Sequence, residues 1–116
     1  MQTPHFYFCL FAIVNRVEKI LEYLRQTPND NFLRHALALE YIKAGNDEKA
    51  QPLFEAILSD SPDYIGSYYH LGKLLERKGE TENAILCYEK GMHAAKVVDD
   101  QHAYNELQAA YEDLVY

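Results

Sequence analysis

Residues 31–64 read NFLRHALALEYIKAGNDEKAQPLFEAILSDSPDY, and residues 65–98 read IGSYYHLGKLLERKGETENAILCYEKGMHAAKVV. When the second segment is placed under the first with an offset of 34 residues, identical residues coincide: Leu37 with Leu71, Gly45 with Gly79, Glu48 with Glu82, Ala50 with Ala84 and Glu55 with Glu89. Self-similarity at a fixed period of this length is typical of proteins in which each repeat is one supersecondary unit. We therefore expect an array of stacked units.

Each segment has the pattern of two helices joined by a tight turn. In the first half of each segment the packed positions recur every three or four residues, on one helical face: Arg34, Leu37, Ala38 and Tyr41, then Tyr68, Leu71, Gly72 and Leu75. The small residues Ala38 and Gly72 let a neighbouring helix approach closely. Gly45 and Gly79 are expected just past the ends of these helices, with Asp47 and Thr81 as N-caps of the next helices.

The order of these residues resembles the tetratricopeptide repeat, whose pattern is W-x2-L-G-x2-Y…A-x3-F…P. The matching residues are Leu37, Ala38, Tyr41, Ala50, Phe54 and Pro62 in the first segment, and Tyr68, Leu71, Gly72, Leu75, Ala84 and Tyr88 in the second. The resemblance implies an all-α fold of antiparallel helical hairpins stacked in a right-handed superhelix, as in small bacterial repeat proteins. Because Lys96 stands where the closing proline would be, we expect the last helix of the second segment to continue past Met92 towards Val98.

The repeat pattern continues beyond both segments. Pro28 lies 34 residues before Pro62, so residues 17–24 resemble the second helix of an incomplete preceding repeat. The spacing of the first helices returns near the C-terminus at Tyr104, Leu107 and Tyr111, after the N-cap candidates Asp99 and Asp100. We predict a repeat domain over residues 15–116, which consists of a partial repeat (15–30), two full repeats (31–64 and 65–98) and a C-terminal capping helix (99–116).

Residues 1–14 form a predicted apolar N-terminal extension, in which Phe6 to Val14 are all apolar. No Lys or Arg precedes this run and no cleavage motif follows it, which argues against a secretory signal. Three interpretations stand: an extension of the first helix, a patch for self-association or membrane adhesion, or a segment upstream of the domain. We expect it to be disordered or only opportunistically packed, and an exposed patch of this kind favours oligomers.

Composition and charge narrow the class of function. The net charge of -7 disfavours nucleic acid as a partner, and no apolar run is long enough for a transmembrane helix. Cys9 and Cys87 lie far apart outside any CxxC pair, which favours a reducing, cytoplasmic compartment and two small buried hydrophobes. The chain has no phosphate-binding loop, nucleophile elbow or zinc helix, and its histidines are scattered. We therefore predict no catalytic residues, no cofactor and no metal site.

In the tetratricopeptide-repeat family, which this sequence resembles, the first helix of each hairpin lines a concave groove that binds a protein or peptide. At about 100° per residue, the positions turned away from the packed face give ten candidate binding residues. These are Phe32, His35, Leu39, Lys43, Tyr69, Lys73, Arg77, His102, Asn105 and Glu112. A peptide with an apolar anchor and an acidic group near Lys73 and Arg77 would suit this surface.

We predict from this surface an interaction adaptor that is not an enzyme. Two alternatives remain open at the level of the sequence. One is a structural, self-associating repeat protein, and the other is a non-catalytic regulatory subunit of an enzyme.

Overall fold

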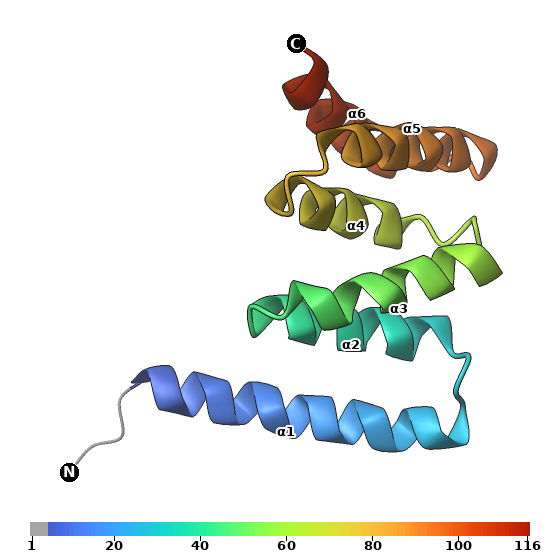
Figure 1. Ribbon diagram of the computed structural model, residues 1–116. Helices are drawn as coiled ribbons and strands as arrows, with labels where there is room; N and C mark the ends of the chain where they lie inside the picture. Colours follow the sequence, from blue (N-terminus) through green and yellow to red (C-terminus); the bar gives the residue numbers. More distant parts are fainter. Residues whose placement is uncertain (1–4) are drawn as a thin grey trace. The chain divides into compact units, whose positions relative to one another are not determined.

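The computed structural model describes the backbone of residues 5–116 and the side chains of residues 11–116. The described residues form helices joined by short turns, with no strand among them (Figure 1). The helices are α1 (His5–Gln26), α2 (Asn31–Lys43), α3 (Asp47–Asp60), α4 (Gly66–Arg77), α5 (Thr81–Val97) and α6 (Gln101–Val115). The predicted all-α fold of helical hairpins is confirmed, and each 34-residue segment contains two helices.

Helix α1 differs from the expectation for the N-terminal region. It runs without a break from His5 to Gln26, so the predicted boundary at residue 15 lies inside a helix. Of the three interpretations of the apolar segment, an extension of the first helix agrees with the helical backbone of residues 5–14. Backbone hydrogen bonds continue the helix even where the apolar residues show no helical period. Residues 1–4 and the side chains of residues 5–10, including Cys9, lie outside the described part.

Three of the turns end their helices in the same way. The N–H of Gly45 donates to the carbonyl of Ile42, and the N–H of Asn46 donates to the carbonyl of Tyr41. The turns after α4 and α5 repeat this pair of bonds around Gly79 and Asp99. Gly45, Gly79 and Asp99 each have a positive φ, as the Schellman motif requires, and glycine adopts this conformation without strain. The glycine ends predicted from the sequence are confirmed.

The N-caps are shifted by one residue from the prediction. The Asn46 side chain, not that of Asp47, accepts the N–H of Lys49 at 3.2 Å and caps α3. The N-cap residue of α5 is Glu80, whose side chain makes no capping hydrogen bond, and Thr81 is already the first residue of the helix. Asp99 and Asp100 were both N-cap candidates for the last helix. The Asp100 side chain caps α6 by accepting the N–H of Ala103 at 3.0 Å, whereas Asp99 belongs to the end of α5.

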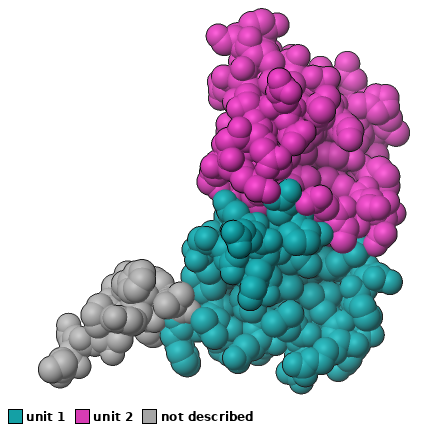
Figure 2. Space-filling view, in the orientation of Figure 1, with its two compact units in different colours: residues 1–53 teal, residues 54–116 magenta. Residues whose placement is uncertain are grey.

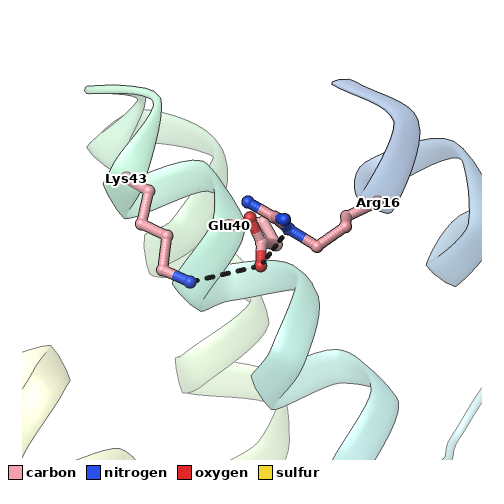
Figure 3. Close-up of polar contacts among 3 residues, drawn as sticks. All are labelled: Arg16, Glu40 and Lys43. Atoms are coloured by element: carbon pink, nitrogen blue, oxygen red, sulfur yellow. Dashed lines mark hydrogen bonds and ion pairs between the residues drawn. The ribbon is translucent and has the colours of Figure 1, made fainter. Parts of the chain in front are cut away.

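The chain divides into two compact units, residues 1–53 and residues 54–116 (Figure 2). In the first unit α1 packs against α2, and Leu37, Ala38 and Ala50 are buried. Glu40 of α2 is nearly buried and accepts Arg16 of α1 at 3.2 Å and Lys43 at 3.4 Å (Figure 3). This shared carboxylate ties the two helices together by charge-assisted hydrogen bonds.

In the second unit α4, α5 and α6 pack on one another, and the second half of α3 contributes Phe54 and Ile57 to the core. Consecutive helices of this unit run in opposite directions (Figure 1). Close packing depends on small residues. A Cβ atom added to Gly72 of α4 would lie within 3.0 Å of the Tyr88 ring, and one added to Gly91 of α5 would meet Tyr68 and Leu107. Helix α5 continues to Val97, as predicted.

Candidate functional site

Tyr69, Lys73 and Arg77 follow one another at intervals of four residues on α4, away from its buried face. Tyr69 and Lys73 are half-buried and Arg77 is exposed. The Lys73 ammonium lies 5.7 Å from the centre of the Tyr69 ring and 3.5 Å from a carboxylate oxygen of Glu76. The ring and the carboxylate both attract the cation, so they hold the long side chain of Lys73 over the helix.

Glu76 connects this surface to the core of the second unit. The Tyr88 hydroxyl of α5 donates to the Glu76 carboxylate. Burial, together with this hydrogen bond and the nearby negative charge, holds the pKa of Tyr88 far above its usual value. The hydroxyl therefore stays a donor even at an alkaline pH where an ordinary tyrosine would lose its proton. The position of Glu76 three residues after Lys73 is the signal from which this pair could have been found.

His70 extends the aromatic part of the surface inward. Its ring stacks on Phe54 of α3, with centroids 6.1 Å apart, and meets Tyr69 edge-on at 5.6 Å. Burial lowers the pKa of His70, and the charge of Arg77 lowers it further, whereas Glu106 of α6 acts in the opposite direction. His70 was not predicted as a site residue, because Phe54, the ring on which it stacks, becomes its neighbour only through packing.

Helix α6 contributes the remaining predicted residues of the second unit. It packs against both α4 and α5. His102, Asn105 and Glu112 are all exposed, and the Asn105 side chain accepts a hydrogen bond from Gln101 at 2.8 Å. Exposed polar groups on a packed helix are available to a partner without unfolding of the core.

The other four predicted residues lie on α2 in the first unit. Phe32 is 72% exposed, His35 and Leu39 are half-buried, and Lys43 is exposed but paired with Glu40. These four residues and the other six belong to different compact units, so a single groove formed by all ten stays a prediction. Within the second unit, α4 packs against α6. Three of the predicted residues lie on α4 (Tyr69, Lys73 and Arg77) and three on α6 (His102, Asn105 and Glu112).

Two cavities of the second unit lie on the Tyr68 side of α4 and contain none of the ten predicted site residues. One, of about 540 Å³, is lined by Pro62, Asp63, Tyr68 and residues of α5 from Glu89 to Val97. The other, of about 470 Å³, lies between the second half of α3 and the first half of α5, with Leu71 and Leu75 of α4 among its lining residues. No sequence motif marks them, because their walls come from different repeats.

The described residues contain no group of three or more His, Cys, Asp or Glu side chains placed to hold a metal ion. No helix among them combines the length and the apolar character needed to span a bilayer. Cys87 is a free, buried thiol whose pKa is raised by burial to about 12. It is buried, as expected for a small hydrophobe.

Comparisons with known proteins agree with this architecture. The tetratricopeptide-repeat family model matches residues 65–95. A TPR repeat-containing protein of Pseudomonas aeruginosa is 25% identical over 91 residues, which cover 78% of this chain and 87% of that protein.

Two solved structures are also similar. A tetratricopeptide-repeat domain protein of Salinibacter ruber is 44% identical, with a TM-score of 0.71 over 73% of this chain and 94% of that one. The TPR2B domain of yeast Sti1, solved in a complex with pHsp70, is 16% identical and shares the fold, with a TM-score of 0.82 over 93% of this chain and 86% of that one. With its repeats, its helical hairpins and these relatives, the chain belongs to the tetratricopeptide-repeat family, whose fold is a non-catalytic module for protein–protein interaction.

Proposed function

We propose that this chain is a cytoplasmic adaptor without catalytic activity, which binds a peptide segment of a partner protein on the surface formed by α4 and α6. The observation that carries the proposal is the arrangement of Tyr69, Lys73 and Glu76 on the solvent side of α4. An aromatic ring and a cation are held there by contacts that reach the core through Tyr88. A surface ordered before binding loses less entropy when it binds.

The chemistry of this surface defines the peptide. Tyr69 offers an apolar face to an apolar side chain, and Lys73 with the neighbouring Arg77 attracts a carboxylate. Glu76 offsets part of the Lys73 charge, so the acidic group of the peptide gains most beside Arg77. His102 and Asn105 of α6 supply polar contacts at the rim. The free, buried thiol of Cys87 supports the reducing compartment that we propose.

The test is affinity capture from a bacterial extract with the wild type and the triple variant Tyr69→Ala, Lys73→Glu, Arg77→Glu. We expect the variant to lose the captured proteins, because the anchor is removed and the charge is reversed. The matched control is Tyr23→Ala, Lys19→Glu, Arg25→Glu, since these residues are exposed on α1 and the change in charge is the same. Equal capture by the wild type and the α4 variant would refute the proposed surface.

A second candidate function, self-association, is favoured by the exposed apolar residues of α1. Phe11 is 73% exposed, Val14 is 48% exposed and Leu21 is 38% exposed, and their spacing places them on one side of the helix. Sedimentation of the wild type and of Phe11→Glu, Val14→Glu tests this candidate. A dimer that dissociates in the variant, while partner capture persists, would establish two separate functions.

A further inference from the structure

The two cavities of the second unit adjoin each other and form one trough beside α5. Pro62, Tyr68 and Lys90 line both cavities, which therefore share part of their wall. The trough lies on the Tyr68 side of α4, whereas Tyr69 and Lys73 point to another side of that helix. It is therefore a surface separate from the one proposed above for peptide binding.

The two ends of the trough expose apolar side chains of α5. Leu86 at one end is 53% exposed, and Val97 at the other is 72% exposed. Their separation of 11 residues spans roughly 16 Å along the helix axis. Pro62 and Ala94 lie between these ends, and a cavity of about 540 Å³ is within the usual range for binding pockets. Exposed apolar area of this kind gains free energy when a partner covers it.

The rim of the trough is acidic. Asp63 and Glu89 line the larger cavity and Glu55 lines the smaller one, whereas Lys90 lines both as a basic residue. Helix α3 has no basic residue in its last turn and ends at Asp60, so the negative end of its dipole adds to these carboxylates. Burial raises the pKa of Tyr68, which lines both cavities, and the nearby Cys87 and Asp63 raise it further.

We propose that this trough is a second docking site, which binds a basic, apolar peptide segment of a partner protein. Apolar side chains of that segment cover the surface from Leu86 to Val97, and its Lys or Arg residues face Asp63 and Glu89. The two surfaces of the second unit then bind peptides of opposite charge, because Lys73 and Arg77 of the α4 surface attract an acidic peptide and the trough attracts a basic one. One chain can therefore hold two different segments.

The experiment uses two synthetic 14-residue amphipathic peptides as probes, one with leucine and lysine faces and one with leucine and glutamate faces. Binding to the full chain is followed by fluorescence anisotropy and by backbone amide NMR shifts. We expect the Leu/Lys peptide to bind saturably and to shift the amides of residues 86–97. The Leu/Glu peptide should leave these amides unchanged.

A pair of charge-matched variants separates the trough from general attraction to an acidic protein. Leu86→Lys, Val97→Lys should weaken binding of the Leu/Lys peptide more than about tenfold, because apolar contact is lost at both ends. Gln26→Lys, Gln101→Lys has the same net charge, changes exposed residues and should retain the wild-type affinity.

Three results would overturn the proposal: equal affinity in the two variants, equal binding of both peptides, or shifts confined to α4 and α6. It would also fail if the wild type were a dimer that only the Leu86, Val97 variant dissociates, since the occupant would then be a second copy of the chain. The variants of this experiment leave Tyr69, Lys73 and Arg77 unchanged. If the trough proposal fails, the peptide-binding surface on α4 and α6 is still tested separately by affinity capture.

Discussion

Gly72 on α4 lies where the Tyr88 ring packs against the helix and leaves no room for a side chain. Alanine is a better helix former than glycine by about 1 kcal/mol, yet its Cβ would overlap the ring of a fully buried side chain. We expect the overlap to dominate, so that Gly72→Ala lowers the free energy of unfolding by roughly 1–3 kcal/mol. Urea unfolding followed by circular dichroism measures the change. Asn105→Ala, at an exposed helical position, should change it little, and a Gly72→Ala protein as stable as wild type would contradict the prediction.

His70 should make the stability of the fold depend on pH. Burial lowers its folded-state pKa below the ordinary value of 6.5, so the unfolded chain binds a proton more readily. The free energy of unfolding should therefore decrease as the pH falls from 6.5 towards the folded-state pKa, and then level off with respect to this group. Thermal melting between pH 7.5 and 5 measures this dependence.

The matched variants for this prediction are His70→Gln and His93→Gln. Removal of the His70 ring should reduce the slope of melting temperature against pH, even though loss of its stacking lowers stability at every pH. His93 is exposed, and its replacement should retain the wild-type slope. If both variants keep that slope, another group causes the acid sensitivity.

At the scale of the helix, two adjacent aspartates in the turn between α5 and α6 have opposite effects on stability: Asp99 destabilises the end of α5, and Asp100 stabilises the start of α6. Asp99 has a φ of 60° at the end of α5, a conformation that is strained for a residue with a Cβ, and its charge lies at the negative end of the helix dipole. Asp99→Gly should therefore raise the free energy of unfolding by about 1 kcal/mol. Asp100→Ala should lower it by about 1 kcal/mol, because α6 loses its cap. Chemical denaturation of both variants tests the pair, and effects of the same sign would contradict this description of the turn.

The helices could be predicted from the sequence because the information for a hairpin is local. Leu37 and Gly45 recur as Leu71 and Gly79, and these residues specify a packed face and a helix end within one repeat. The N-terminal part of α1 stayed open between three interpretations, one of them an extension of the first helix, because its aromatic run shows no helical period, although backbone hydrogen bonding needs none. The N-cap errors of one residue at Asp47 and Thr81 arose because several capping residues follow one another in each turn.

At the scale of the whole molecule, surfaces that combine different repeats were harder to predict. Tyr69 and Lys73 could be placed on the outer face of α4 by helical angle alone. The contact of Tyr88 with Glu76 could not, because it joins two helices through their packing. The trough lined by Tyr68 and Lys90 was missed for a similar reason, since it is defined by space that side chains of α3, α4 and α5 leave unfilled.

The division into two compact units predicts uneven effects of core mutations. In repeat proteins each unit is stabilised by itself and by its neighbours, so damage spreads less than in a protein with one closed core. Leu107 of the second unit is 1% exposed, and Leu107→Ala should cost about 2–5 kcal/mol. We expect amide hydrogen exchange to accelerate most in α4, α5 and α6. The first unit offers the reciprocal variant, Leu37→Ala, at a residue that is 3% exposed, which should accelerate exchange most in α1 and α2. If each variant reduced protection equally along the whole chain, the molecule would unfold as one cooperative block, and the two units would have no separate stability.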